Sequence, residues 1–451
     1  MSYLPKMGSF LVALIVGIST ASWAAGDTDE LRDRDDRIAS LESKMEGMIG
    51  EIERLRTQVA VPEEKELVST YGLGPAASKI YGVERGLSIG GYGEGFWTNY
   101  VSDESSGSFK NADGDTRSDS DLNRSDFYRW VMYMGYKFSE NILFNAEIEF
   151  EHATTGATET YGGGSVSVEF AALEFFWKEY LNARVGMLLV PMGFLNEIHE
   201  PNTFHGVQRP HSEKYIIPST WRENGIGIFG NIGGNLEYRS YLITSLNADG
   251  FSNSGVRSGR QKGAKALAED VGWVTRADYQ LMPSLSIGGS VYFGATSHNQ
   301  EVSGTKMPDA DLTIWEIHGQ WNYAGFETRA MYVQSDLDDA AELNSVLGKS
   351  ATAAIAEEAQ GYYGEVAYDL GKHLFGGRQY FAPFFRFEHV NPQDKMPTGY
   401  TATGSKELDI LTFGLTYKPH PNVVLKAEYR NFDAESGEEA DELSLGMGFA
   451  F

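Results

Sequence analysis

The chain has 451 residues and a formal net charge of −26, because 63 acidic side chains outnumber 37 basic ones. This excess of negative charge argues against nucleic acid as a partner, since binding to a phosphate backbone requires a basic surface. The 51 glycines, 24 tyrosines and 25 phenylalanines, with 14 prolines and no cysteine, favour many short strands joined by turns and exclude a fold held by disulfides.

The first 24 residues have the pattern of an export signal. Lys6 gives a basic start, residues 10–18 form a short apolar core, and Ala24 ends a Ser-Trp-Ala sequence of the kind that a signal peptidase cleaves. We therefore expect a signal peptide over residues 1–24. The alternative is a membrane anchor, but a helix needs about 20 apolar residues to cross a bilayer and this core is shorter.

Residues 25–60 are predicted to form a helical coiled coil in the periplasm, followed by a linker over residues 61–85. A helix with so narrow an apolar face cannot bury it alone, so we expect self-association. An amphipathic helix lying on the mouth of a barrel is the alternative. The apolar positions follow the three-and-four spacing of a heptad repeat and are Leu31, Ile38, Leu41, Met45, Met48, Ile52, Leu55 and Val59.

From Gly86 to Phe451 the pattern changes to period two, which predicts an all-β transmembrane barrel of antiparallel strands over residues 86–451. Glu147 and Glu149 alternate with Ile148, for example, so that one face meets water and the other meets lipid. We expect about 16 strands of about 10 residues, the length that a tilted strand needs to cross a membrane. They are predicted at residues 86–100, 124–138, 141–153, 166–178, 181–190, 223–233, 235–247, 270–281, 285–297, 311–323, 325–336, 358–370, 379–391, 407–418, 422–432 and 441–451.

The connections between these strands alternate between short and long. Residues 139–140 and 233–234 are short turns, whereas residues 101–123 and 191–222 are long loops. This alternation is typical of a barrel in the outer membrane of a Gram-negative bacterium, and an even strand number leaves both ends on the periplasmic side. The last strand ends on Phe451 and resembles the C-terminal assembly signal of bacterial outer-membrane proteins.

A barrel of about 16 strands is too wide for side chains to fill, so we expect a water-filled lumen. The third long connection mixes charged and apolar side chains and is predicted to fold inward as a constriction; a loop that merely shields a trimer is the alternative. Its candidate pore residues are Glu197, Glu200, Arg209, Lys214 and Arg222. The alternation along the strands predicts the further lumen residues Arg129, Glu147, Glu149, Glu174, Arg386, Glu388, Lys426, Glu428 and Arg430.

Residues 182–193, which read Asn-Ala-Arg-Val-Gly-Met-Leu-Leu-Val-Pro-Met-Gly, and residues 222–227 resemble the family named for the phosphate-selective porins O and P. The resemblance implies a 16-stranded trimeric barrel with its third loop folded inward, preceded in some members by a coiled coil. Phosphate-specific members line the lumen with a ladder of arginines and a lysine cluster. Here the predicted lumen cations alternate with glutamates, which favours cations or small neutral solutes and leaves anion or phosphate selectivity as the alternative.

The sequence thus predicts passive diffusion of small hydrophilic solutes and ions, with outer-membrane lipids and other copies of the chain as partners. No metal or cofactor is expected, and an enzyme is disfavoured: His199 and His205 have metal-ligand chemistry, but Pro201 prevents a helix that would present both. A structural tether from the outer membrane to peptidoglycan through the coiled coil is the remaining alternative, and conductance separates the two.

Overall fold

The computed structural model describes residues 37–50, 67–101, 109–110, 116–117, 123–153, 164–437 and 439–451. The chain divides into two units, Met1–Glu66 and Leu67–Phe451. The expected signal peptide lies outside the described residues, as does most of the expected coiled coil, of which residues 37–50 are α-helical. None of the helices in the described ranges is long and apolar enough to span a membrane.

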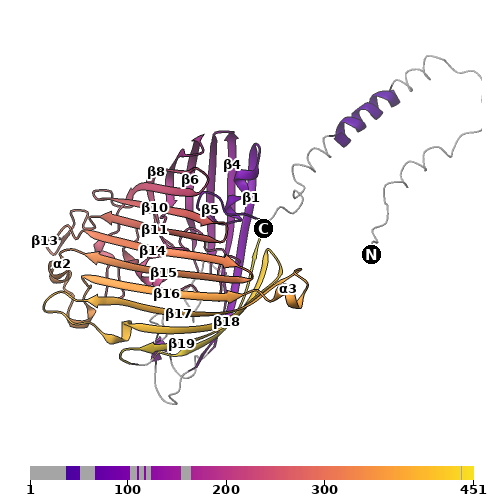
Figure 1. The fold of residues 1–451 in the computed structure, drawn as a ribbon. Helices are drawn as coiled ribbons and strands as arrows, with labels where there is room; N and C mark the ends of the chain where they lie inside the picture. The colour runs from indigo at the N-terminus through magenta and orange to yellow at the C-terminus, as the bar shows by residue number, and fades with distance from the viewer. Residues whose placement is uncertain are drawn as a thin grey trace, which may run out of the picture. The chain divides into compact units, whose positions relative to one another are not determined.

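The second unit is a closed barrel of sixteen antiparallel strands, as the period-two pattern predicted. Each strand pairs with its neighbours along the chain, and β1 pairs with β20 to close the ring, with Tyr92 opposite Ala450. Figure 1 shows these strands side by side, coloured from indigo at β1 to yellow at β19. They are β1 (Gly86–Val101), β4 (Asn123–Ser139), β5 (Ile142–Glu151), β6 (Val166–Lys178), β7 (Leu181–Leu189), β8 (Arg222–Ile232), β9 (Leu236–Thr244), β10 (Val271–Met282), β11 (Leu285–Gly294), β14 (Leu312–Tyr323), β15 (Phe326–Leu337), β16 (Glu358–Tyr368), β17 (Tyr380–Lys395), β18 (Leu408–His420), β19 (Val423–Ala434) and β20 (Asp441–Ala450).

Short elements lie in the connections between the barrel strands and, in the case of η1, before β1. Two hairpins are formed by β2 (Phe109–Lys110) with β3 (Thr116–Arg117) and by β12 (Glu301–Val302) with β13 (Thr305–Lys306). The short helices are η1 (Ala77–Gly82), the π-helix η2 (Ser212–Ile216), η3 (Ala248–Gly250), η4 (Arg257–Gly259), α2 (Ala340–Val346), η5 (Ala351–Ala353), α3 (Gly371–Leu374) and η6 (Gly404–Lys406).

The two faces of the strands have opposite character. On β20, Leu443, Leu445 and Met447 are 41 %, 51 % and 45 % exposed, whereas Ser444 between them is 0 % exposed. An apolar face of this kind around a whole barrel suits lipid rather than water, and the inward positions hold the polar side chains. The alternation seen in the sequence therefore separates a lipid-facing outside from a polar interior.

Residues 67–85, which belong to the expected linker, pack against the inner wall of the barrel. Ala76, Ala77 and Leu73 form a buried cluster with Tyr92 and Val131 of the wall. The helix η1 contacts β1, β4 and β5. This segment therefore occupies part of the interior beside the first strands.

Candidate channel interior

The connection between β7 and β8, residues 190–221, leaves the wall at a closed base. The backbone N–H of Val190 donates to the carbonyl of Trp221 at 3.0 Å. Asn196 joins both ends: its Nδ2 donates to the carbonyls of Val190 and Trp221 at 2.6 and 2.9 Å, and its Oδ1 accepts from the N–H of Trp221 at 2.6 Å. All three residues are fully buried, so these bonds hold the two ends of the loop together out of water.

The loop crosses the interior and binds the opposite side of the barrel. In the ring of sixteen strands, β17 and β18 stand eight places from β7 and β8. Lys418 on β18 donates to the carbonyl of Asn202 at 2.8 Å, and Thr416 lies 3.0 Å from Nδ1 of His205. The glycine Gly448 on β20 lets the loop approach, because a Cβ there would come within 2.5 Å of Pro201.

Two inward carboxylates bind the backbone of the loop. Glu428 accepts hydrogen bonds from the N–H groups of Val207 and Gln208 at 2.9 and 3.0 Å, and Glu388 accepts from the N–H of His211 at 2.6 Å. Buried N–H groups need such acceptors, and a carboxylate serves them more strongly than a neutral oxygen. These two glutamates therefore fasten the loop to β19 and β17.

Glu213, on η2, fastens the loop to itself and to β16. Its carboxylate accepts from the backbone N–H of Leu195 and from the hydroxyl of Tyr363, each at 2.7 Å. Burial raises the pKa of Glu213 above its usual value, and the two hydrogen bonds oppose that rise. Glu213 is therefore an internal anchor of the loop.

On its near side the loop meets the N-terminal segment and β4. Arg129 donates to the carbonyl of His199 at 2.9 Å. Glu200 accepts from the backbone N–H groups of Ala76 and Ala77 at 2.9 and 3.3 Å. Burial raises the pKa of Glu200 to about 7 despite these bonds. Glu200 thus links the loop to residues 67–85.

Many charged side chains that were predicted to line the lumen form ion pairs, either with one another or with charged side chains that were not predicted. The pairs are Arg129 with Glu94 (2.6 Å) and Glu149 (3.6 Å), Arg184 with Glu174 (2.9 Å), Arg239 with Glu197 (3.0 Å), Arg386 with Glu388 (2.9 Å), Arg430 with Glu428 (3.6 Å), and Arg222 with Glu169. Ion pairs this deeply buried stabilise a wall only when both partners remain, so they brace the interior. Two of the paired residues, Glu94 and Arg430, also line an open space beside the loop.

Glu94, Arg184, Glu169 and Arg239 were not among the predicted residues. Arg184 alternates with Asn182 on β7, so the period-two rule would have found it. Glu169 is different, because the register between β5 and β6 shifts at Glu147 and the alternation along β6 breaks there. A β-bulge of this kind turns an additional side chain inward, and the sequence pattern does not show it.

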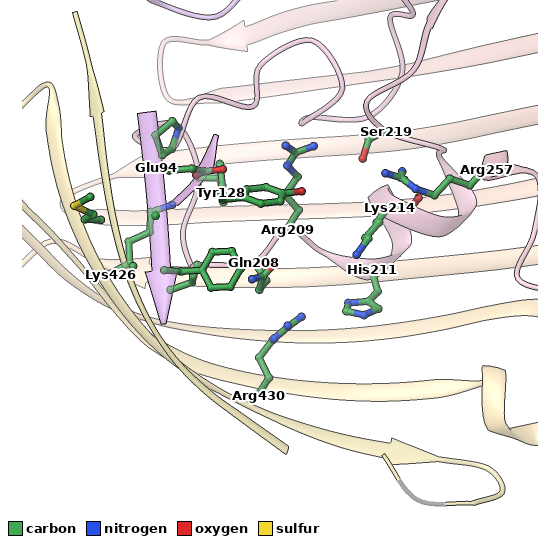
Figure 2. Close-up of a pocket in the computed structure, with 17 residues that line it drawn as sticks. Glu94, Tyr128, Gln208, Arg209, His211, Lys214, Ser219, Arg257, Lys426 and Arg430 are labelled. Carbon is green, nitrogen blue, oxygen red and sulfur yellow. Dashed lines mark hydrogen bonds between the residues drawn. The ribbon is translucent and has the colours of Figure 1, made fainter. Parts of the chain in front are cut away.

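Beside the loop lies a cavity of about 720 Å³ that is open to solvent, and the volume includes part of that open region. Figure 2 shows side chains from the loop, from β1 and β19, and from the next long connection around it. Its charged and imidazole-bearing lining residues are Arg209, His211, Lys214, Arg257, Lys426, Arg430 and Glu94. Five of these are arginine or lysine and one is acidic, so basic residue types predominate in the lining although the whole chain is acidic.

Four predicted pore residues meet at this space: Arg209 and Lys214 from the loop, and Lys426 and Arg430 from β19. Lys426 Nζ lies 3.7 Å from the centre of the Phe204 ring. Arg257 was missed, because it lies on η4 in another connection, where it donates to the carbonyl of Lys214 at 2.9 Å. The sequence pattern along one segment does not show that the connection carrying Arg257 packs against the loop carrying Lys214.

A group of possible metal ligands includes another residue of the loop, His199. Nε2 of His199 is 3.9 Å from Oε1 of Glu147 and 3.7 Å from Oε2 of Glu169. Within the described ranges it is the one such group in which the ligand atoms lie within 4.8 Å of one another. The sequence had paired His199 with His205, on the same segment, and so did not reveal carboxylates supplied by two strands.

No family model matches the chain. An uncharacterized protein of Aquifex aeolicus is 34 % identical over 406 residues, which cover 88 % of this chain and 87 % of the relative. Among solved structures, OmpF of Salmonella typhi, in complex with daunomycin, is similar with a TM-score of 0.50 and 11 % identity over 82 % of this chain and 98 % of that chain.

The outer membrane channel DcaP of Acinetobacter baumannii is similar at a TM-score of 0.49 and 14 % identity, over 81 % of this chain and 97 % of that chain. At such low identity a structural likeness shows the fold alone. The likeness to OmpF therefore shows a sixteen-strand barrel of the type that outer-membrane porins have.

Proposed function

The chain belongs to one family with the Aquifex aeolicus protein, and we propose that it is an outer-membrane porin that lets small hydrophilic solutes and ions diffuse passively across the membrane. The observation that carries this proposal is a closed ring of sixteen strands with apolar side chains outside and charged side chains inside. A barrel of this size is wider than its own side chains can fill. Its ordinary role in an outer membrane is a channel rather than catalysis.

In this proposal residues 190–221 form the constriction. The two ends of the loop are bonded together beside β7 and β8, and its far side is bonded to β18, which stands on the opposite side of the ring. A segment held at both sides reduces the free cross-section of the lumen, and solutes pass through what remains. The space beside Arg209 is the part of this interior through which we expect them to pass.

The lining of that space favours small anions. Arg209, Lys214 and Lys426 stand around it, and the carboxylate of Glu428 is occupied by two N–H groups of the loop. Positive side chains at a narrow point raise the local concentration of anions. This supports the anion-selective alternative over passage of cations, and phosphate-like solutes fall within its range. Kinship with the phosphate-selective porin family is part of the same proposal and rests on residues 182–193.

We further propose a trimer joined by a periplasmic coiled coil over residues 25–60, after removal of residues 1–24. The helix over residues 37–50 carries Ile38, Leu41, Met45 and Met48, all exposed and all on the spacing of one helical face. A second copy is the simplest partner that buries such a face. Contact with peptidoglycan would add a tether to the channel without replacing it.

The test is single-channel conductance of the purified full-length protein in a planar bilayer, with the reversal potential measured in a potassium chloride gradient. We expect stepwise conductance, a reversal potential of anionic sign, and a lower chloride current when inorganic phosphate is added. A cationic sign would remove the anion-selective proposal but leave the porin. No conductance from protein with an intact β-sheet spectrum would overturn the porin and favour the tether.

A further inference from the structure

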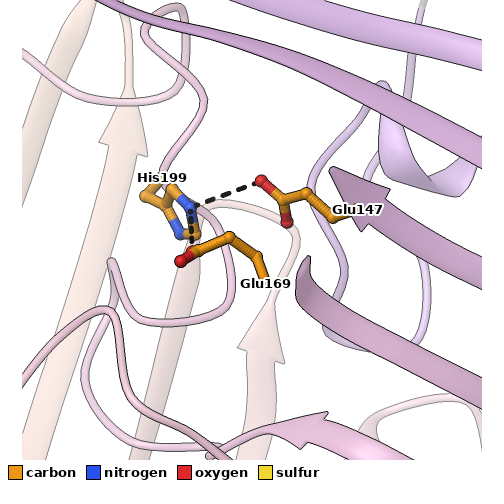
Figure 3. Close-up of side chains that lie close together, drawn as sticks. All are labelled: Glu147, Glu169 and His199. Atoms are coloured by element: carbon orange, nitrogen blue, oxygen red, sulfur yellow. Dashed lines mark ion pairs between the residues drawn. The ribbon is translucent and has the colours of Figure 1, made fainter. Parts of the chain in front are cut away.

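Three acid–base side chains meet at a point that the proposed solute path does not use. Glu147 comes from β5, Glu169 from β6 and His199 from the inward loop, and Figure 3 shows the three side chains pointing toward one another. They are 1 %, 1 % and 2 % exposed. Polar groups this deeply buried need a hydrogen-bond partner or counter-charge within the protein, because they no longer contact water.

Each of the three has a buried polar atom without a hydrogen-bond partner. These atoms are Oε2 of Glu147, Oε2 of Glu169 and Nε2 of His199. The separations of 3.7 and 3.9 Å between Nε2 and the two carboxylates are too long for direct hydrogen bonds. Leaving three such atoms unsatisfied in one place is costly, and native interiors rarely do so.

The contact on the other side of the imidazole ring fixes its orientation. Nδ1 of His199 lies 3.1 Å from the carbonyl oxygen of Asn196. A carbonyl accepts and does not donate, so Nδ1 carries the hydrogen, and in the neutral ring Nε2 then presents a lone pair toward the carboxylates. A backbone acceptor behind the imidazole is the arrangement that orients histidine ligands in metal sites.

The neighbouring charges leave Glu147 without a cationic side chain. Arg222 pairs with Glu169, and Arg129 pairs with Glu94 and Glu149. For Glu147, the one basic partner within ion-pair distance in the part of the chain that the structure describes is His199. The two arginines reduce the negative potential here but do not reach Glu147, so a small mobile cation is the counter-charge that fits.

We propose that Glu147, Glu169 and His199 bind one divalent transition-metal cation, with Zn²⁺ as the best match. Imidazole nitrogen with two carboxylate oxygens suits Zn²⁺ and its neighbours in the first transition row, whereas Ca²⁺ and Mg²⁺ prefer oxygen ligands throughout. Metal–ligand bonds near 2.1 Å in a tetrahedral site separate the ligand atoms by about 3.4 Å. Here Nε2 of His199 stands 3.7 and 3.9 Å from the two carboxylates, and the three ligand atoms all lie within 4.8 Å of one another, so the side chains would have to close around the cation.

The cation would tie the inward loop to the wall between β5 and β6. His199 is the loop's contribution, and its carbonyl is already held by Arg129. This binding site is independent of the proposed transport function, since the metal is held beside the loop rather than carried through the lumen. Conductance and Zn²⁺ binding are therefore separate measurements, and the failure of one proposal leaves the other standing.

The experiment is isothermal titration of ZnCl₂ into full-length protein that carries no histidine tag and has been freed of metal with a chelator. We expect one equivalent of Zn²⁺ per chain. His199→Gln and Glu147→Gln should each weaken the affinity for Zn²⁺ by at least about tenfold. Losing a residue that only hydrogen-bonds to a metal ligand already weakens metal affinity by about that much, and losing a ligand itself should cost no less. One variant removes an imidazole of the loop and the other removes a carboxylate of the wall. If one of them fails to fold, the other still tests the site.

His205→Gln is the matched control, because His205 is a buried imidazole of the same loop that faces one carboxylate, Glu327, at 3.4 Å. It should bind Zn²⁺ as the parent does. Co²⁺ should give visible absorption bands with the parent and the control, and lose them with His199→Gln. The proposal is overturned if the folded parent takes up no Zn²⁺, or if His199→Gln and the parent bind it equally.

Discussion

The carboxylate of Glu428 accepts a hydrogen bond from the backbone N–H of Val207 at 2.9 Å, across the interior of the barrel. Its other oxygen accepts from the next N–H of the loop at 3.0 Å. The acid on β19 is thereby directed to the loop backbone, and its neighbours Lys426 and Arg430 face the open space. One pair of hydrogen bonds thus helps to set both the position of the loop and the sign of the lining.

Replacing Glu428 with glutamine should loosen the loop. The amide oxygen still accepts from one N–H, but the amide nitrogen faces the other, which leaves one buried donor unsatisfied at a cost of about 1–3 kcal/mol. We expect the free energy of unfolding to fall by about that amount in a urea titration. Glu140→Gln, at an exposed turn, is the control and should change it by less than about 0.5 kcal/mol. An equal loss in both variants would contradict the assigned role.

Reversing the charge at Arg209 should reduce anion selectivity. A unit charge about 8 Å from an ion in water contributes about 0.5 kcal/mol, so Arg209→Glu disfavours an anion by about 1 kcal/mol and favours a cation by the same amount. The anion-to-cation permeability ratio should therefore fall by about thirtyfold at most. The reversal potential in a salt gradient measures this shift, which should shrink at high salt. Lys306→Glu, on the exposed hairpin strand β13, makes the same change in net charge and should leave the potential unaltered.

The pH dependence of stability should depend on Glu213. Its pKa is raised above 4.5 in the folded protein by burial, so the protonated form favours folding. That contribution is complete below the unfolded pKa and is lost as the pH rises through the higher, folded value. The unfolding temperature should therefore fall as the pH rises above about 4.5, and Glu213→Gln should flatten this slope. Glu301→Gln, on exposed β12, should keep the slope of the parent.

Adding a methyl group at Gly448 should displace the loop. A Cβ there would come within 2.5 Å of the Pro201 ring, which cannot move without the loop backbone. We expect Gly448→Ala to destabilise the protein by about 1–3 kcal/mol and to change the single-channel conductance. Gly364→Ala is the control, because a Cβ there meets nothing within 4 Å. An unchanged conductance for Gly448→Ala would show that the loop does not set the channel's width.

The strands were predictable because each carries its own signal. Leu443, Leu445 and Met447 alternate with small residues whether or not the partner strand is known, and short turns separate one period-two segment from the next. The sixteen predicted strands therefore agree with the observed ones to within a few residues. The inward assignment of Arg129, Glu147 and Arg386 follows from the same rule, and all three are buried.

What the sequence did not reveal depends on contacts between distant segments. Residues 67–85 have no periodicity of their own, and they pack inside because the wall offers apolar side chains such as Tyr92 and Val131. Arg257 reaches the lining from a different connection, and Glu169 turns inward at a bulge. Each of these positions is set by tertiary packing, which a pattern along one strand does not encode.

The loop that spans the interior also acts as a strut. Its base is held by Val190 and Trp221 beside β7 and β8, and its tip is held by Lys418 on a strand eight places around the ring. Lateral pressure from the bilayer tends to flatten a wide cylinder into an oval. Flattening along this diameter would compress the strut, and widening along it would stretch buried hydrogen bonds. The barrel is therefore stiffest along the line that the loop follows.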